Sequence, residues 1–236
     1  MVPQPIRWRQ TLRKLMDCAR RIGASSESGP PELVHVQLYY SATSPYVRKV
    51  RIVAIEKGLD GAIELVEAMP WPDPSLISTQ NPLGKVPALV LDDGSALYDS
   101  PVICEYLDTL GEGSRLLPQA GPARWRSLRI QALADGIMDA AVSIVLERRR
   151  PAELQSLEAI QRATQAIRRG VVALAQDLGP DLTAPFDLAQ IATAVAIGYL
   201  HFRLPDLELG LGSRRISEWW SLIRERPSLA ATAPPI

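Results

Sequence analysis

A predicted strand and a predicted helix meet in the sequence SATSPYVRK, residues 41–49. Residues 34–40 alternate apolar and polar side chains as a half-buried strand does, and apolar side chains then recur at helical spacing until Gly58. Pro45 is therefore expected to be the first helical residue and Ser44 the N-cap. Working outward from this junction predicts the rest of the fold.

The hydroxyl of Ser44 would lie beside backbone N–H groups at the positive end of the helix dipole. This position suits it to stabilising an anion. A serine before proline can equally be a helix cap without chemistry. The two roles are compatible, because a hydroxyl can accept one hydrogen bond while it donates another.

Composition narrows the functional classes. The chain has 236 residues, and its 26 Lys and Arg balance its 26 Asp and Glu, so no strong global field would attract nucleic acid or an anionic membrane. Two cysteines, Cys18 and Cys104, provide neither a disulfide framework nor a metal-ligand cluster. We therefore expect no metal and a reduced, cytoplasmic setting. No apolar run approaches the ~20 residues of a membrane span.

Residues 1–33 have the pattern of an N-terminal extension that ends in a linker rich in Ser, Gly and Pro. One face of a possible helix is apolar, and the remainder is strongly basic. Three interpretations stay open: a helix docked on the folded body or on a partner, a translation start placed too far upstream, or a surface-seeking amphipathic segment.

Residues 34–110 predict the order strand, helix, strand, followed by strand, strand, helix. The second strand covers residues 63–66, and the strand–helix–strand order implies a parallel pair with a right-handed crossover. Residues 88–91 and 95–98 flank an Asp-Asp-Gly turn, which is a hairpin signal. A small mixed sheet with helices is therefore expected.

Two local signals place the remaining features of this half. Residues 81–87 contain two prolines and a glycine, which indicates a constrained loop, and Val86-Pro87 before the next strand is a candidate for the cis isomer. Ser100, which precedes a proline, is expected to start the last helix of this half of the chain, and Gly111 is expected to end it.

Residues 111–122 are expected to be a linker, and residues 123–236 an all-helical domain. Helical periodicity extends over residues 123–147, 152–178, 187–202 and 213–224. Asp187 followed three residues later by Gln190 has the form of a capping box and predicts a firm helix start.

This plan resembles the glutathione transferase family: an α+β thioredoxin-like N-terminal domain of the form βαβ–ββα, followed by an all-α C-terminal domain. The resemblance covers the chain from about Val34 onward. Its motifs are Ser44-Pro45-Tyr46 with Arg48, typical of the serine and cysteine subgroups, NPLGKVP at 81–87, DSPVICEYL at 99–107 and RPSLAAT at 226–232.

The resemblance implies that the protein activates the thiol of glutathione. Ser44 is then the residue that stabilises the thiolate, and Thr43 is the alternative donor. Arg48, about one turn into the helix, either adds positive potential or is a solvated surface arginine. Because serine cannot form a mixed disulfide, the motif argues against relatives that work through their own cysteine.

The same resemblance assigns the glutathione-binding residues. Ser100 would hold the γ-glutamyl carboxylate at a helix N-terminus, and Asp99 would pair with the amino group of the tripeptide. Asp99 is one methylene shorter than the glutamate that is common there. Val86 would present its backbone to the cysteinyl moiety as an added strand, and Lys85 would meet the glycyl carboxylate.

The electrophile is expected between the domains, beside Tyr46, Trp71 and the helix at residues 123–147. Cys104 falls within a helix pattern and is interpreted as a core residue. The function implied is conjugation of glutathione to a hydrophobic electrophile, as in detoxification, by a homodimer. Alternatives are a glutathione-dependent disulfide reductase or peroxidase, and a protein-binding module that has lost catalysis.

Overall fold

The computed structural model describes residues 36–71, 73–111, 113–178, 185–207 and 214–235. The predicted extension, residues 1–33, lies outside the described residues. The sheet-containing part and the helical part of the chain belong to one compact unit, residues 34–236.

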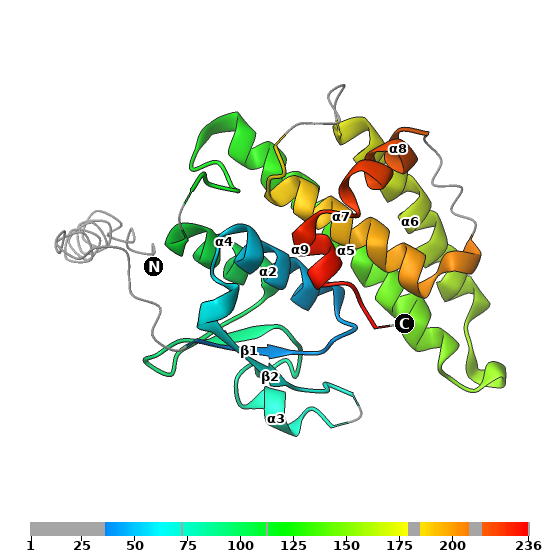
Figure 1. Ribbon diagram of the computed structural model, residues 1–236. Coiled ribbons are helices and arrows are strands. Elements are labelled where there is room, and N and C mark those ends of the chain that lie inside the picture. Colours follow the sequence, from blue (N-terminus) through cyan, green and yellow to red (C-terminus); the bar gives the residue numbers. More distant parts are fainter. Residues whose placement is uncertain (1–35, 72, 112, 179–184, 208–213, 236) are drawn as a thin grey trace, which may run out of the picture. The chain divides into compact units, whose positions relative to one another are not determined.

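A four-stranded mixed sheet carries the first part of this unit (Figure 1). Its strands are β1 (Val36–Tyr40), β2 (Ile63–Glu67), β3 (Ala88–Val90) and β4 (Ala96–Leu97), and its helices are α2 (Pro45–Glu56), α3 (Ser75–Ser78) and α4 (Ser100–Leu110), with a short 3₁₀ turn at Asp60–Ala62. The spatial order is β2-β1-β3-β4. β1 and β2 run parallel, whereas β3 is antiparallel to both of its neighbours. Helices α2 and α4 pack against each other.

Helices form the rest of the unit. They are α5 (Gly121–Arg148), α6 (Leu157–Asp177), α7 (Leu188–Arg203), α8 (Arg214–Ile223) and α9 (Pro227–Ala231), with 3₁₀ turns at Ala152–Leu154 and Pro205–Leu207. Helix α5 packs against both α6 and α7. Every residue of α7 from Leu188 to Leu200 except Gln190 is buried, so α7 forms the centre of this part. The N-cap Asp187 accepts a bond of 2.9 Å from the backbone N–H of Gln190, as the sequence predicted.

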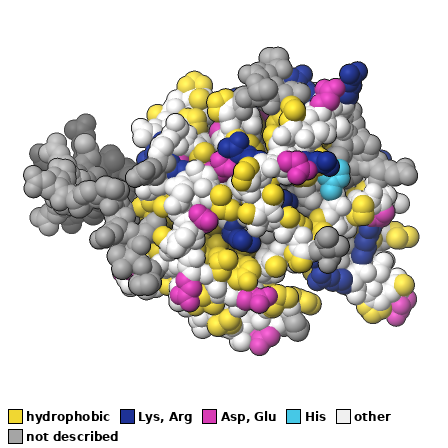
Figure 2. All heavy atoms as spheres, in the orientation of Figure 1, with side chains coloured by type: hydrophobic (Ala, Val, Ile, Leu, Met, Phe, Trp, Pro, Cys, Tyr) yellow, Lys and Arg dark blue, Asp and Glu magenta, His cyan; other side chains and the backbone are white. Residues whose placement is uncertain are grey.

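The fold class predicted from the sequence is confirmed: a βαβ–ββα domain is followed by helices. The Val86-Pro87 bond is cis, as expected. The face of the molecule in Figure 2 shows acidic and basic side chains interspersed among its described residues, in keeping with the charge balance of the chain.

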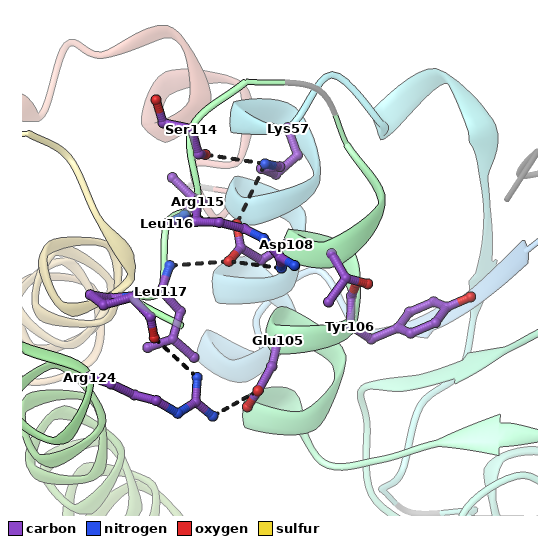
Figure 3. A network of polar contacts seen from close by, with 11 residues as sticks. Lys57, Glu105, Tyr106, Asp108, Ser114, Arg115, Leu116, Leu117 and Arg124 are labelled. Atoms are coloured by element: carbon purple, nitrogen blue, oxygen red, sulfur yellow. Dashed lines mark hydrogen bonds and ion pairs between the residues drawn. The ribbon is translucent and has the colours of Figure 1, made fainter. Parts of the chain in front are cut away.

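Asp108 in α4 joins the two parts of the fold (Figure 3). Its carboxylate accepts backbone N–H bonds from Leu116 at 2.8 Å and Leu117 at 3.1 Å, and it lies 3.5 Å from Nζ of Lys57. Lys57 also donates to the carbonyl oxygen of Ser114 at 3.2 Å. Both charged side chains are almost fully buried, at 2% exposure for Asp108 and 1% for Lys57. A buried carboxylate of this kind must keep its partners, because an unpaired buried charge is costly.

Gly111 ends α4 at the point where this connection passes close to the end of α2. A Cβ atom at Gly111 would lie 2.4 Å from the carbonyl oxygen of Lys57, a separation that a side chain cannot occupy. The glycine that signals a helix end in the sequence is therefore also required by the close approach of two backbones.

We expect Asp108→Ala to lower the free energy of unfolding by about 3–5 kcal/mol, because Lys57 and two backbone N–H groups would lose their partner in the interior. Urea unfolding followed by circular dichroism measures this change. The matched control is Glu105→Ala on the same helix, which removes the partly exposed pair with Arg124 at 2.7 Å. Its cost is expected to be about 1 kcal/mol or less. Equal losses of unfolding free energy in the two variants would contradict the assignment of Asp108 as a buried carboxylate on which its partners depend.

Candidate functional site

The register of the sheet gathers the predicted site residues at one edge. Tyr39, next to the end of β1, pairs with Ala88 at the start of β3. Leu97 at the end of β4 pairs with Leu89. The chain therefore leaves β1, enters β3 and leaves β4 at the same side of the sheet. Six of the residues predicted from the sequence lie at this side, five in the connecting segments and Ser100 at the first position of α4: Thr43, Ser44, Lys85, Val86, Asp99 and Ser100.

Ser44 caps α2 as the sequence predicted. Its backbone is extended (φ −77°, ψ 123°), and its Oγ accepts a bond of 3.3 Å from the backbone N–H of Val47, while Pro45 is the first helical residue. The hydroxyl hydrogen of Ser44 takes no part in that bond, so it remains available to an anion. The positive end of the helix dipole acts at the same point.

A small open cleft lies over this cap, with room behind its mouth for about one water molecule. The N-terminal part of α2, the C-terminal segment and α7 contribute its walls, and the lining residues are Ala42, Thr43, Ser44, Pro45, Arg48, Val195, Tyr199, Phe202 and Pro234. The two predicted hydroxyl donors, Thr43 and Ser44, therefore face the same cleft, whose opposite wall is largely apolar.

Arg48 is half-buried and is tied to the C-terminal segment, so it is not the freely solvated surface arginine that was the alternative from the sequence. Its Nη2 donates to the carbonyl oxygen of Leu229 at 3.1 Å, and its Nε makes a long bond of 3.5 Å to Oγ1 of Thr232. No carboxylate pairs with it among the residues that the structure describes. Burial lowers the pKa of Arg48 to about 10, and the side chain stays cationic at neutral pH.

The loop before β3 is organised by Asn81, a residue that the sequence analysis did not single out. Its buried side chain accepts from the backbone N–H of Leu83 at 3.0 Å and donates to the carbonyl oxygen of Lys85 at 2.8 Å. The Asn-Pro dipeptide was the signal that could have identified it. The loop leaves Lys85 exposed. The side chain of Val86 packs in the same apolar cluster as Val47 of α2.

Asp99 and Ser100 stand at the start of α4. Ser100 is the first helical residue and is buried, whereas Asp99 occupies the N-cap position, is exposed, and makes no side-chain capping bond. The N-terminal N–H groups of an 11-residue helix therefore lie beside both residues. This arrangement can receive a carboxylate, as α2 can receive a thiolate.

The structure does not bring Tyr46 and Trp71 to the cleft. The hydroxyl of Tyr46 donates to the carboxylate of Asp139 in α5, and burial, together with this bond, raises the pKa of Tyr46. The side chain of Trp71 is 70% exposed. The cleft wall comes instead from α7, whose apolar residues cannot be told from ordinary core residues in the sequence alone.

A buried ion pair fixes α2 against α5 below the cleft. Nζ of Lys49 lies 2.6 and 2.8 Å from the two carboxylate oxygens of Asp135, with the lysine side chain fully buried. Burial raises the pKa of Asp135, and the neighbouring Lys49 opposes that rise. The carboxylates of Asp135 and Asp139 are thus both engaged by residues of α2.

Cys104 lies in the core, as expected. It is a fully buried free thiol, and burial raises its pKa to about 12, so it carries no thiolate at neutral pH. Within the described parts of the chain, no group of three or more His, Cys, Asp or Glu side chains could hold a metal ion. No helix in those same parts is long and apolar enough to cross a membrane.

Comparisons with known proteins agree with this geometry. Residues 43–110 match the family model described as glutathione S-transferase, N-terminal domain. An uncharacterised GST-like protein, YibF of Escherichia coli, is 36% identical over 213 residues, which cover 85% of this chain and 99% of that protein.

Solved structures extend the likeness over the whole fold. A glutathione transferase family member from Pseudomonas fluorescens Pf-5 with bound glutathione is 41% identical, with a TM-score of 0.82 over 85% of this chain and 100% of that chain. A second structure from that strain, with bound S-(propanoic acid)-glutathione, is 40% identical, with a TM-score of 0.77 over 85% and 98%. The N-terminal family model, the relatives matched over nearly their full length and the architecture together show that this chain belongs to the glutathione S-transferase family.

Proposed function

We propose that this protein is a glutathione transferase that activates the thiol of glutathione for attack on a hydrophobic electrophile. The observation that carries the proposal is the cap of α2. A hydroxyl with an uncommitted proton stands at a helix N-terminus and faces a cleft with an apolar wall. A free thiol has a pKa of ~8.5, so only a few per cent is thiolate at pH 7. A hydrogen bond from Ser44 and the dipole of α2 both favour the charged form.

The remaining site residues have complementary roles in the proposal. Ser100 and the N-terminal N–H groups of α4 receive the γ-glutamyl carboxylate, and Asp99 pairs with the amino group. Lys85, exposed on its loop, meets the glycyl carboxylate. The backbone of Val86 receives the cysteinyl moiety by strand addition. The common edge of the sheet supports this assignment, since one extended tripeptide can run along it.

The relatives also support glutathione as the ligand. The two structures from Pseudomonas fluorescens hold glutathione and a glutathione carrying a substituent on sulfur. We extend glutathione binding to this chain on that likeness. A homodimer and a role in detoxification complete the proposal and rest on the family resemblance alone, and a cytoplasmic location is proposed from the low cysteine content.

A reductase that forms a mixed disulfide with its own cysteine fits the site less well. The residue at the cap is Ser44, and no cysteine is among the residues that line the cleft. The buried thiol of Cys104 is inaccessible. A protein-binding module without catalysis remains the outcome if glutathione does not bind.

Replacing Ser44 with glycine tests the thiolate role. Glycine is nearly as good an N-cap, so the helix start is expected to lose only a few tenths of a kcal/mol. The pKa of the bound glutathione thiol should rise by about one unit, and kcat/KM at neutral pH should fall about tenfold, because one pKa unit is worth about 1.4 kcal/mol. Ultraviolet titration of the thiolate in the complex measures the pKa. Full activity in the Ser44→Gly, Thr43→Ala double variant would reject the mechanism.

Ser100→Ala tests binding separately from activation. Loss of a hydrogen bond to a carboxylate costs about 1.5–3 kcal/mol, so the Kd for glutathione should rise about 10- to 100-fold. The pKa of the bound thiol should stay as in the wild type, since Ser100 is assigned to the γ-glutamyl carboxylate and not to the cysteinyl residue that carries the thiol. Isothermal titration calorimetry gives the Kd. A shifted thiol pKa with unchanged affinity would show that the two serines have been assigned the wrong way round.

A further inference from the structure

Arg48 is the only Lys or Arg among the lining residues of the cleft, all of which the structure describes. It sits one helical turn beyond Ser44, and its backbone N–H donates to the carbonyl oxygen of Ser44 at 3.1 Å. One turn of helix corresponds to about 5–6 Å along the axis. The cleft therefore presents a hydroxyl and, about one turn away, a guanidinium.

The guanidinium of Arg48 has N–H donors that bind no acceptor among the described residues. A guanidinium carries five N–H donors, and the described residues engage Nη2 and, weakly, Nε. Nη1 has no hydrogen-bond partner in the described part of the chain. Such a cation has no counter-ion and is partly removed from water. Binding of an anion therefore stabilises it.

The fold makes a specific space for this side chain. A Cβ atom at Gly198 of α7 would lie 2.7 Å from Nη1 of Arg48 and 3.0 Å from the ring of Trp220. The glycine thus lets the guanidinium lie directly against α7, beside the apolar wall. An arginine needed only for solubility would not require this opening.

The two carboxylates of α5 that contact α2 do not neutralise Arg48. Asp135 is bound by Lys49, and Asp139 accepts the hydroxyl of Tyr46. The one charged side chain among the described residues that line the cleft, Arg48, is therefore positive.

We propose that the electrophile of this enzyme carries a carboxylate, and that Arg48 receives it while the apolar wall of α7 holds the reactive part of the molecule over the thiolate. This specificity rests on the proposed transferase function and narrows its substrate class. Arg48 acts on substrate choice, whereas Ser44 acts on the sulfur. In the reaction the thiolate forms a C–S bond to the electrophilic carbon, the leaving group departs with its electron pair, and the thiol proton has already passed to solvent.

The test uses two aryl chlorides that differ only in charge: a chloronitrobenzoate with chlorine para to the carboxylate, and the corresponding neutral benzamide. In each case chloride is the leaving group. For each variant we take the ratio of kcat/KM for the acid to that for the amide, after dividing each value by its uncatalysed rate constant with glutathione. We expect this ratio to exceed one in the wild type and to fall about 10- to 100-fold in Arg48→Met, because a charged hydrogen bond is lost. Arg48→Lys should retain part of the preference for the acid. Lysine keeps the positive charge but cannot donate two parallel hydrogen bonds to a carboxylate as a guanidinium can.

Arg226→Met is the matched control. Arg226 also ties α9 to α2, through two bonds of 2.7 Å to Glu56, but it is not among the residues that line the cleft. It should leave the acid-to-amide ratio unchanged. The proposal is overturned if Arg48→Met leaves the ratio unchanged, or if it slows both substrates equally while raising the thiol pKa, which would place Arg48 at the sulfur.

Calorimetry with glutathione separates failure of this proposal from failure of the transferase function. Wild-type protein that binds glutathione and conjugates the amide, without preference for the acid, overturns only the substrate class. Protein that neither binds glutathione nor conjugates either chloride overturns both.

Discussion

The N-terminus of α2 lies where the fold and the proposed chemistry meet. The chain leaves β1, turns through Ser44 and starts the helix at Pro45, so the cap hydroxyl is fixed by the same residues that begin the helix. Because β3 and β4 present their own ends at this edge of the sheet, a second helix N-terminus and an organised loop arrive beside it. A ligand with charges at separate points can then be met by groups that the backbone has already positioned.

Such positioning requires that α2 does not move, and charged side chains hold it on several sides. Lys49 reaches Asp135 of α5, Lys57 reaches Asp108 of α4, and Glu56 accepts two bonds from Arg226 beside α9. Two of these contacts involve almost fully buried lysines. Buried ion pairs add little net stability compared with apolar packing, but they tolerate few alternative arrangements. Their value here is that they fix the direction of the helix, and with it the position of Ser44 and Arg48.

Much of this arrangement could be predicted from the sequence. The alternation of residues 34–40, the serine and proline at positions 44 and 45, and the loop at 81–87 predicted the sheet, the cap and the cis bond before β3. These signals are local, and local backbone rules apply to them. The cleft wall was not predictable in this way. Between Ile191 and Leu200, α7 carries apolar or small residues on every side, so its sequence does not show which of them reach a ligand. Tyr46 binds Asp139 and does not line the cleft, and no local pattern shows that contact because the two residues are 93 positions apart in the chain. Only the packing of α2 on α5 and α7 distinguishes a residue that bridges helices from one that faces the cleft.

A crystal structure of the protein with glutathione tests the central claim most directly. The account predicts that the sulfur lies within hydrogen-bonding distance of Oγ of Ser44, that Oγ still accepts from the backbone of Val47, and that the γ-glutamyl carboxylate lies at the start of α4. A sulfur that is directed away from the cap of α2, or a tripeptide bound elsewhere on the fold, would contradict it.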